Sequence, residues 1–274
     1  MSAAAFALAL GSAFLHALWN ILLARERDPE PATAIAICAS VVVFAPVAAL
    51  RWGVDPQVWP FIAVTSLLQL FYFSLLATVY RRAELSFVYP IARGLAPVLV
   101  LVVGVVALGT GASPAQAAGV CLVGVGILLV RGIGRERDAV GGILALAIAS
   151  SIAAYTLVDK SGIRYADPIV YLELAMLPTA LGGLLLVSLL PSGPRRLREA
   201  ARPVPAAAGI ISFTAYVLVL AALQRAPAAS VAAVRETSVL IVAALAASTL
   251  GERVNPARLV GAALVVAGVA LIVV

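Results

Sequence analysis

The chain has 274 residues, of which 63% are hydrophobic and 12% are charged, and its net charge is +6. A soluble globular domain carries about 25% charged residues, so the composition excludes that class and predicts a polytopic membrane protein. The positive charge does not indicate a nucleic-acid partner, because all Lys and Arg except Arg93 and Arg235 lie in the short segments between apolar runs or at the ends of these runs. The lipid bilayer is the expected partner.

Apolar runs of 17 to 25 residues, each long enough to span a bilayer, follow one another along the chain. They cover residues 3–24, 32–50, 58–80, 84–108, 114–130, 139–159, 168–190, 204–224, 227–250 and 256–274. Short breaks rich in proline, glycine and charge separate them. The sequence therefore predicts an all-α fold with ten transmembrane helices. The first run is too long for the core of a signal peptide, so we expect it to be retained.

The fourth run carries Arg93 about nine residues inside an apolar stretch, which at about 1.5 Å per residue is roughly 13 Å deep. A guanidinium group at that depth costs several kcal/mol unless it meets a partner or a water-filled cavity. Pro90 and Pro97 also remove backbone hydrogen bonds, which membranes tolerate only inside a bundle or beside a cavity. The ninth run places Arg235 at a matching depth. We expect the two arginines on opposing walls of one central cavity.

The two halves of the chain share a pattern at an offset of 142 residues. The matching pairs are Arg93 and Arg235, Gly109 and Gly251, Pro114 and Pro256, Gly119 and Gly261, and Gly126 and Gly268. Because arginine, proline and glycine match together, a repeat is favoured over chance alignment of similar apolar helices. Each half has five helices, an odd number, so the second half enters the membrane in the opposite sense. We predict two inverted five-helix repeats, residues 1–133 and 134–274, around a central substrate cavity.

Polar and aromatic side chains recur at helical spacing on several predicted helices. Ser12, His16, Trp19 and Asn20 share one face of the first helix, which predicts a cavity wall, with hydrogen bonds between helices as the alternative. Together with Arg93 and Arg235, the further candidates for substrate binding are Gln69, Tyr72, Tyr89, Tyr155 and Tyr216. Asp159 lies near the end of its run, a position that favours a solvated helix cap over a proton site.

Three side chains could carry a coupling proton: Glu236, Glu173 and His16. For the two glutamates the alternative is a structural ion pair or a position near the membrane surface. Glu236 follows Arg235 directly, which on a continuous helix separates the two side chains by about 100°, so we do not expect them to pair. The two cysteines, Cys38 and Cys121, lie in apolar runs without metal-ligand spacing, and no metal or cofactor is expected.

Gly119 and Gly126 are seven residues apart, as are Gly261 and Gly268. Seven residues make two helical turns, so each pair shares one face and permits close helix contact. Packing onto the bundle is the simpler interpretation of these faces, and a homodimer seam is the alternative.

Several local motifs complete the pattern. They are His16-Ala17-Leu18-Trp19-Asn20 in the first helix, the turns at Arg82-Ala83 and Arg225-Ala226, and the helix starts Pro114-x4-Gly119 and Pro256-x4-Gly261. With these motifs, ten short helices in two inverted repeats resemble the EamA-type members of the drug/metabolite transporter superfamily over nearly the whole chain. The resemblance implies that helices 1–4 and 6–9 surround a cavity, that helices 5 and 10 are peripheral, and that the termini are cytoplasmic.

Loop charges predict the opposite orientation. The connections after the odd-numbered helices hold 13 arginines, whereas the other connections hold four basic residues. The connections richer in arginine are expected in the cytoplasm, which places both termini outside in a bacterial inner membrane.

We predict a secondary transporter, not an enzyme, that exports small organic solutes such as amino acids or related metabolites by alternating access. Export and the solute classes are what the resemblance implies. The arginines would hold a carboxylate or another anionic group, and the aromatic side chains would pack the apolar part. Multidrug efflux and exchange of organic anions or phosphate esters are alternatives on the same fold. A passive channel or an intramembrane enzyme fits less well, because buried arginines in an inverted repeat suit a gated carrier and no catalytic motif is present.

Overall fold

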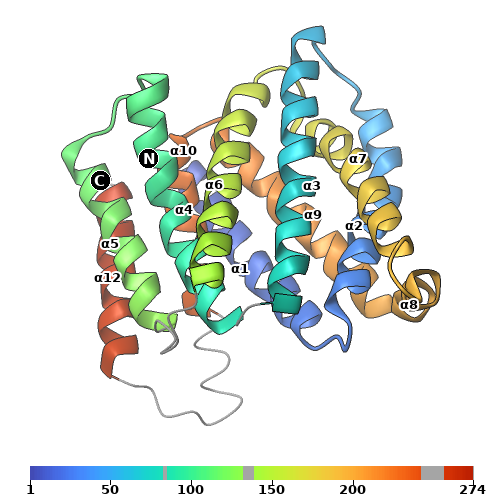
Figure 1. Ribbon diagram of the computed structural model, residues 1–274. Coiled ribbons are helices and arrows are strands. Elements are labelled where there is room, and N and C mark those ends of the chain that lie inside the picture. Colours follow the sequence, from blue (N-terminus) through green and yellow to red (C-terminus); the bar gives the residue numbers. More distant parts are fainter. Residues whose placement is uncertain (83–84, 132–138, 242–255, 274) are drawn as a thin grey trace.

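The computed structural model describes residues 1–82, 85–131, 139–241 and 256–273, and in these ranges the chain is almost entirely helical. The helices are α1 (Ala3–Ala24), α2 (Pro29–Leu50), the 3₁₀ helix η1 (Pro56–Val58), α3 (Trp59–Arg82), α4 (Leu85–Leu108), α5 (Pro114–Arg131), α6 (Ala139–Gly162), α7 (Pro168–Ser188), α8 (Gly193–Ala200), α9 (Pro203–Leu223), α10 (Ala228–Arg235) and α12 (Pro256–Val273). Figure 1 shows the long helices running side by side as one bundle.

The predicted runs from 3–24 to 204–224 each coincide with one long helix, with ends that differ by a few residues. Within the described ranges, seven helices are long and apolar enough to cross a membrane, and α5 and α12 contain shorter apolar helices. The all-α membrane fold predicted from the sequence is confirmed. The short helix α8 was not predicted, because it lies in a polar connection that does not cross the bilayer.

The helix ends follow from local sequence. The side chain of Asp167 accepts a hydrogen bond of 2.9 Å from the backbone N–H of Ile169 and so caps the start of α7. Helices α2, α7, α8 and α9 each have a proline in their first turn, where its missing N–H would have no helical partner in any case. Helix α4 is followed by Gly109 with φ of +63°, a left-handed conformation that glycine adopts without strain.

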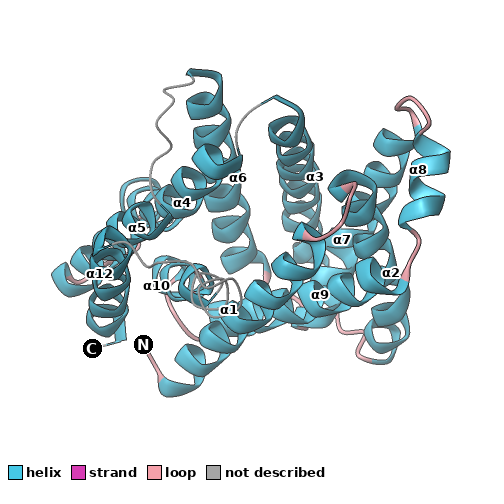
Figure 2. Cartoon of the chain, turned by 90° about the horizontal axis from the view of Figure 1, so that it is seen from below, coloured by secondary structure: helices cyan, strands magenta, loops and turns pink. Residues whose placement is uncertain are grey.

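Helices α5 and α12 pack against each other at one edge of the bundle, far from α8 (Figure 2). A Cβ atom on Gly119 would lie 2.6 Å from the carbonyl oxygen of Gly268, and one on Gly126 would lie 2.6 Å from that of Gly261. A Cβ atom on Gly268 would likewise lie 2.6 Å from the carbonyl oxygen of Gly119, so Gly119, Gly126 and Gly268 are needed for this close contact inside the chain. Their faces, which we considered as a dimer seam, cover each other within the monomer, and a homodimer stays a prediction.

Two sets of contacts join the connections at the two ends of the bundle. At one end, Val54 and Ala166 form an isolated antiparallel bridge, and Arg51 pairs with Asp167 at 3.5 Å. These contacts join the α2–α3 connection to the α6–α7 connection. Both chain termini lie toward this end in Figure 1.

At the other end, α8 contacts the α1–α2 connection. Arg196 bonds Asp28 at 2.7 Å and Glu30 at 2.9 Å, and Arg202 pairs with Glu26. The hydrogen bonds that Arg196 donates to the Asp28 carboxylate, assisted by the one to Glu30, raise the pKa of its guanidinium group above the ordinary value. At each end of the bundle, connections from the first and the second half of the chain are thus joined to each other.

The ninth predicted helix, 227–250, is not continuous. Helix α10 ends at Arg235, and Glu236 and Thr237 form a turn before helical residues 238–241. In this turn the backbone bonds shorten to i→i−3, since the N–H of Thr237 donates to Val234 and that of Val239 donates to Glu236. The Thr237 hydroxyl also donates to the Val234 carbonyl at 2.8 Å. Residues 242–250 lie outside the described ranges.

Candidate functional site

A cavity of about 100 Å³ lies in the centre of the bundle, between α1, α2, α3, α4, α6, α7, α9 and α10. Predicted site residues that line it are Arg93, Arg235, His16, Trp19, Gln69, Tyr72, Tyr155 and Tyr216. Asn20 does not line it; its side chain donates to the His16 carbonyl oxygen at 2.7 Å. The side chain of Tyr89 lies outside the described part of the structure. Polar stripes from several helices therefore meet in one place.

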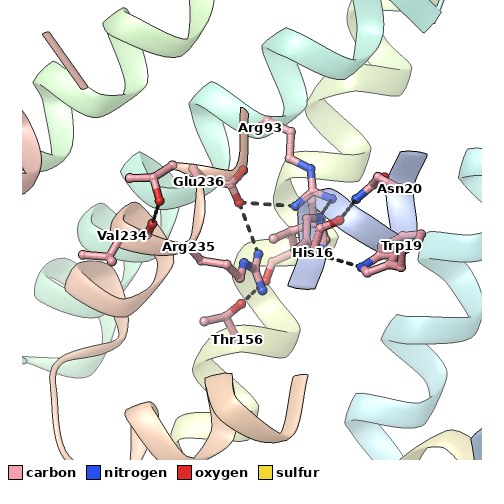
Figure 3. A network of polar contacts seen from close by, with 10 residues as sticks. His16, Trp19, Asn20, Arg93, Thr156, Val234, Arg235 and Glu236 are labelled. Carbon is pink, nitrogen blue, oxygen red and sulfur yellow. Dashed lines mark hydrogen bonds and ion pairs between the residues drawn. The ribbon is translucent and has the colours of Figure 1, made fainter. Parts of the chain in front are cut away.

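The buried arginines meet at one carboxylate. Arg93 Nη1 lies 3.3 Å from Glu236 Oε1, and Arg235 Nη2 lies 3.4 Å from the same oxygen. Figure 3 shows Glu236 between the two guanidinium groups. Our expectation that Glu236 would not pair with Arg235 was wrong, because α10 ends at Arg235 and the backbone then tightens to i→i−3 bonds, so the spacing of a continuous α-helix does not apply. The arginines thus converge rather than face each other from opposing walls.

His16 extends this network from α1. Its Nε2 lies 2.8 Å from Arg93 Nη2, and its Nδ1 accepts a bond of 3.1 Å from the indole N–H of Trp19 (Figure 3). A neutral imidazole has one N–H and one acceptor nitrogen, so it accepts from only one of these two donors. The network around His16 therefore contains more donors than the ring can satisfy.

Two buried donors on the cavity wall have no partner in the described residues. They are Arg235 Nε and Ser12 Oγ, and both residues line the cavity. The network of Arg93, Arg235 and Glu236 also holds two positive charges against one negative charge, and Glu236 Oε2 is itself unpartnered. Unpaired buried donors are costly, and a charged acceptor satisfies them best. This part of the wall is complementary to an anionic group.

Aromatic rings form the wall beside the arginines. The ring centroids of Tyr72 and Tyr155 are 6.2 Å apart, and those of Tyr155 and Tyr216 are 6.1 Å apart, both with edge-to-face geometry. The apolar part of the lining comes from Phe73, Leu172, Met176 and Phe213. The cavity thus has one charged region and one apolar region.

The family profile of EamA-like transporters matches residues 3–132 and 139–274. The chain belongs to the EamA-like transporter family. A solved structure described only as a crystal structure of a protein has the same fold, with a TM-score of 0.78 and 18% identity over 99% of this chain and 96% of that chain. No curated protein matches the sequence significantly. The two profile matches fall on the two halves, in agreement with the inverted five-helix repeats of the drug/metabolite transporter superfamily.

One feature of this EamA-family transporter contradicts the sequence interpretation. Asp159 is not a solvated cap: it is 1% exposed, and α6 continues past it to Gly162. Its Oδ1 accepts hydrogen bonds from Thr65 at 2.7 Å and from Tyr171 at 2.8 Å, and its Oδ2 accepts one from Tyr216 at 2.5 Å. The donors come from α3, α7 and α9, so the sequence around Asp159 could not reveal them.

Helix α2 also contributes to the cavity of this EamA-family member, and its residues were not among the sequence candidates. Thr33, Ile37 and Ser40 line the cavity. Thr33 and Ser40 are two turns apart and so share a face, a signal that could have been read from the sequence. Glu173, in contrast, is buried on α7, does not line the cavity, and forms no ion pair with either arginine.

Proposed function

We propose that this EamA-family transporter carries small organic solutes with a carboxylate group, such as amino acids or related metabolites, by alternating access. The supporting observation is the pair of unpartnered donors, Arg235 Nε and Ser12 Oγ, on the wall of a central cavity with excess positive charge. A carboxylate supplies two acceptor oxygens, and the planar guanidinium group binds them in a fixed geometry.

The remainder of the cavity suits the rest of such a solute. Tyr72, Tyr155 and Tyr216 offer ring faces and edges beside the charged region, and Phe73 and Phe213 offer an apolar surface. An amphipathic solute with an anionic group and an apolar side chain would satisfy both regions. A purely cationic drug would meet the uncompensated positive charge.

The direction and setting are part of the proposal. Export follows from the family resemblance, and a bacterial inner membrane with the arginine-rich connections in the cytoplasm follows from the loop charges. A second candidate is exchange of organic anions or phosphate esters, because two guanidinium groups close together also suit a doubly charged anion.

Counterflow in proteoliposomes tests this function. The panel contains radiolabelled L-amino acids, their amides, phosphate esters and a cationic drug. We expect exchange of the amino acids, and a large loss when the amide replaces the carboxylate. A carrier exchanges solute across the membrane, whereas a channel only equilibrates it and an enzyme consumes it. Exchange of the amides as fast as the acids would contradict the carboxylate assignment.

A matched pair of variants tests the role of Arg235. Arg235→Lys keeps the charge and loses the planar two-pronged geometry, so transport of amino acids should fall about tenfold or more, the equivalent of one strong hydrogen bond. Arg225→Lys is the control, because Arg225 is exposed and, among the described residues, donates to the Ala221 carbonyl oxygen. Thermal unfolding of both variants shows whether they fold like the wild type. Full transport by folded Arg235→Lys would refute the proposed role.

A further inference from the structure

Asp159 joins four helices through a single carboxyl group. It lies on α6 and accepts hydrogen bonds from Thr65 on α3, Tyr171 on α7 and Tyr216 on α9. Every one of these partners is a neutral hydroxyl group that can both donate and accept. The arrangement therefore holds the carboxyl group in place without fixing its charge.

No positive charge contacts this carboxyl group in the described residues, where every ion pair involves other side chains. Lys160, the next residue along α6, points its Nζ to the carbonyl oxygens of Leu223 and Ala226 at the end of α9. A buried carboxylate without a cation costs several kcal/mol, whereas the protonated form carries no such penalty. A proton is thus a ligand that Asp159 can bind and release.

The helices packed around Asp159 carry several other ionisable groups besides Tyr216. They are Tyr155 and Lys160 on α6, Arg93 on α4, Arg235 and Glu236 at the end of α10, and Glu173 and Tyr171 on α7. Glu236 lies between two guanidinium groups that stabilise its negative charge. Protonation of His16 would add a third positive charge beside Arg93. Glu236 and His16, two of the candidates from the sequence, are therefore less suited to proton binding than Asp159.

We propose that Asp159 is the proton-binding group of this protein and that Tyr216 couples proton binding to substrate binding in the cavity. The proposal rests on the transport function proposed above and adds the residue and the direction of coupling. Tyr216 is the link because it lines the cavity and also donates its hydroxyl hydrogen to Asp159 Oδ2.

The coupling follows from hydrogen-bond donors and acceptors. In the ionised state, the Tyr216 O–H donates to Asp159 Oδ2. When a hydronium ion in the cavity transfers its proton to Oδ2, an O–H bond forms there, water is left, and the new carboxyl group donates to the Tyr216 oxygen. The Tyr216 O–H bond stays intact, and the hydroxyl group turns to donate to an acceptor oxygen of the solute. Proton and solute thus stabilise each other's binding, and by linkage each raises the affinity of the other equally. Co-binding moves proton and solute in the same direction, so this inference keeps the proposed solute transport and replaces export by proton-driven uptake.

Infrared difference spectroscopy over a pH series measures proton binding directly, on the full-length protein in liposomes with no substrate present. The wild type should show a protonated-carboxyl C=O band that disappears as the pH rises. Asp159→Asn should remove this band, whereas Glu173→Gln should retain it. A band that persists in Asp159→Asn, or that disappears in Glu173→Gln instead, overturns the assignment.

Counterflow of the radiolabelled L-amino acids at acidic and alkaline pH measures the coupling. The affinity of the wild type should rise by about 5–150-fold on acidification, the usual range for linked sites. Tyr216→Phe should keep the infrared band and lose the pH dependence of the affinity, which separates coupling from folding if Asp159→Asn is unstable. Wild-type exchange that is independent of pH refutes the coupling and leaves the transport function intact. Absence of any exchange refutes the transport function, and the infrared band then decides proton binding alone.

Discussion

Removing the charge of Glu236 should destabilise the protein strongly. In Glu236→Gln the side chain keeps its size, so no cavity forms, and two buried guanidinium groups lose their shared counter-charge. At an effective dielectric constant of about 20, unit charges 3.3–3.4 Å apart attract by about 5 kcal/mol for each pair. Desolvation offsets part of this attraction, and breaking a buried pair costs about 3–5 kcal/mol in measured cases. We expect a loss of that size in the free energy of unfolding.

Unfolding of the detergent-solubilised protein, followed by circular dichroism, measures this loss. Glu199→Gln is the matched control, because its pair with Arg195 on α8 is exposed and screened by solvent, so the free energy of unfolding should hardly change. A double-mutant cycle with Arg93→Gln should give a coupling energy of about 1–3 kcal/mol, since the second change removes an uncompensated charge. A loss below about 1 kcal/mol in Glu236→Gln, or additive effects in the cycle, would refute the reasoning.

Two further predictions concern orientation and packing. In a background without the native cysteines, Arg164→Cys should react with an impermeant thiol reagent in intact cells, and Arg195→Cys should not. The reverse labelling would place the arginine-rich connections outside. Gly209→Ala should lower the free energy of unfolding by about 1–3 kcal/mol, because its Cβ would overlap a backbone carbonyl oxygen of α2. Gly142→Ala is the control, since its Cβ would enter open space, and its stability should not change. Equal melting temperatures of the two variants would contradict the tight α2–α9 contact.

The lengths of the helices and the burial of Arg93 were predictable, because both follow from the physical properties of the bilayer. Its thickness fixes the length of an apolar run, and its low polarity makes a charge in the middle of a run informative. The aromatic and polar stripes were predictable for the same reason, since helical spacing places His16 and Trp19, or Tyr155 and Asp159, on one face.

The partners of these residues were not predictable, because they depend on contacts between helices and on local backbone. The pairing of Glu236 with Arg235 needs the turn at Glu236 and Thr237, whereas the apolar pattern of residues 227–250 predicts a continuous helix. The burial of Asp159 needs hydroxyl donors from three other helices, two of which lie far from it in the sequence. The amino-acid sequence shows where polar groups lie along each helix, and the contacts between helices decide what those groups bind.

The contacts at the two ends of the bundle also constrain how the transporter can move. Helix α2 begins beside the Asp28–Arg196 contact and ends beside the Arg51–Asp167 contact, and the antiparallel helix α7 runs between the same two contacts. These helices come from different halves of the chain and are fastened at both membrane faces. In the alternating access proposed above, they would act as a pivot, and the displacement between the halves would grow with distance from it. Figure 2 places α4 and α10 away from this pivot, with α5 and α12 farther still, so Arg93 and Glu236 would be displaced more than the residues of α2 and α7.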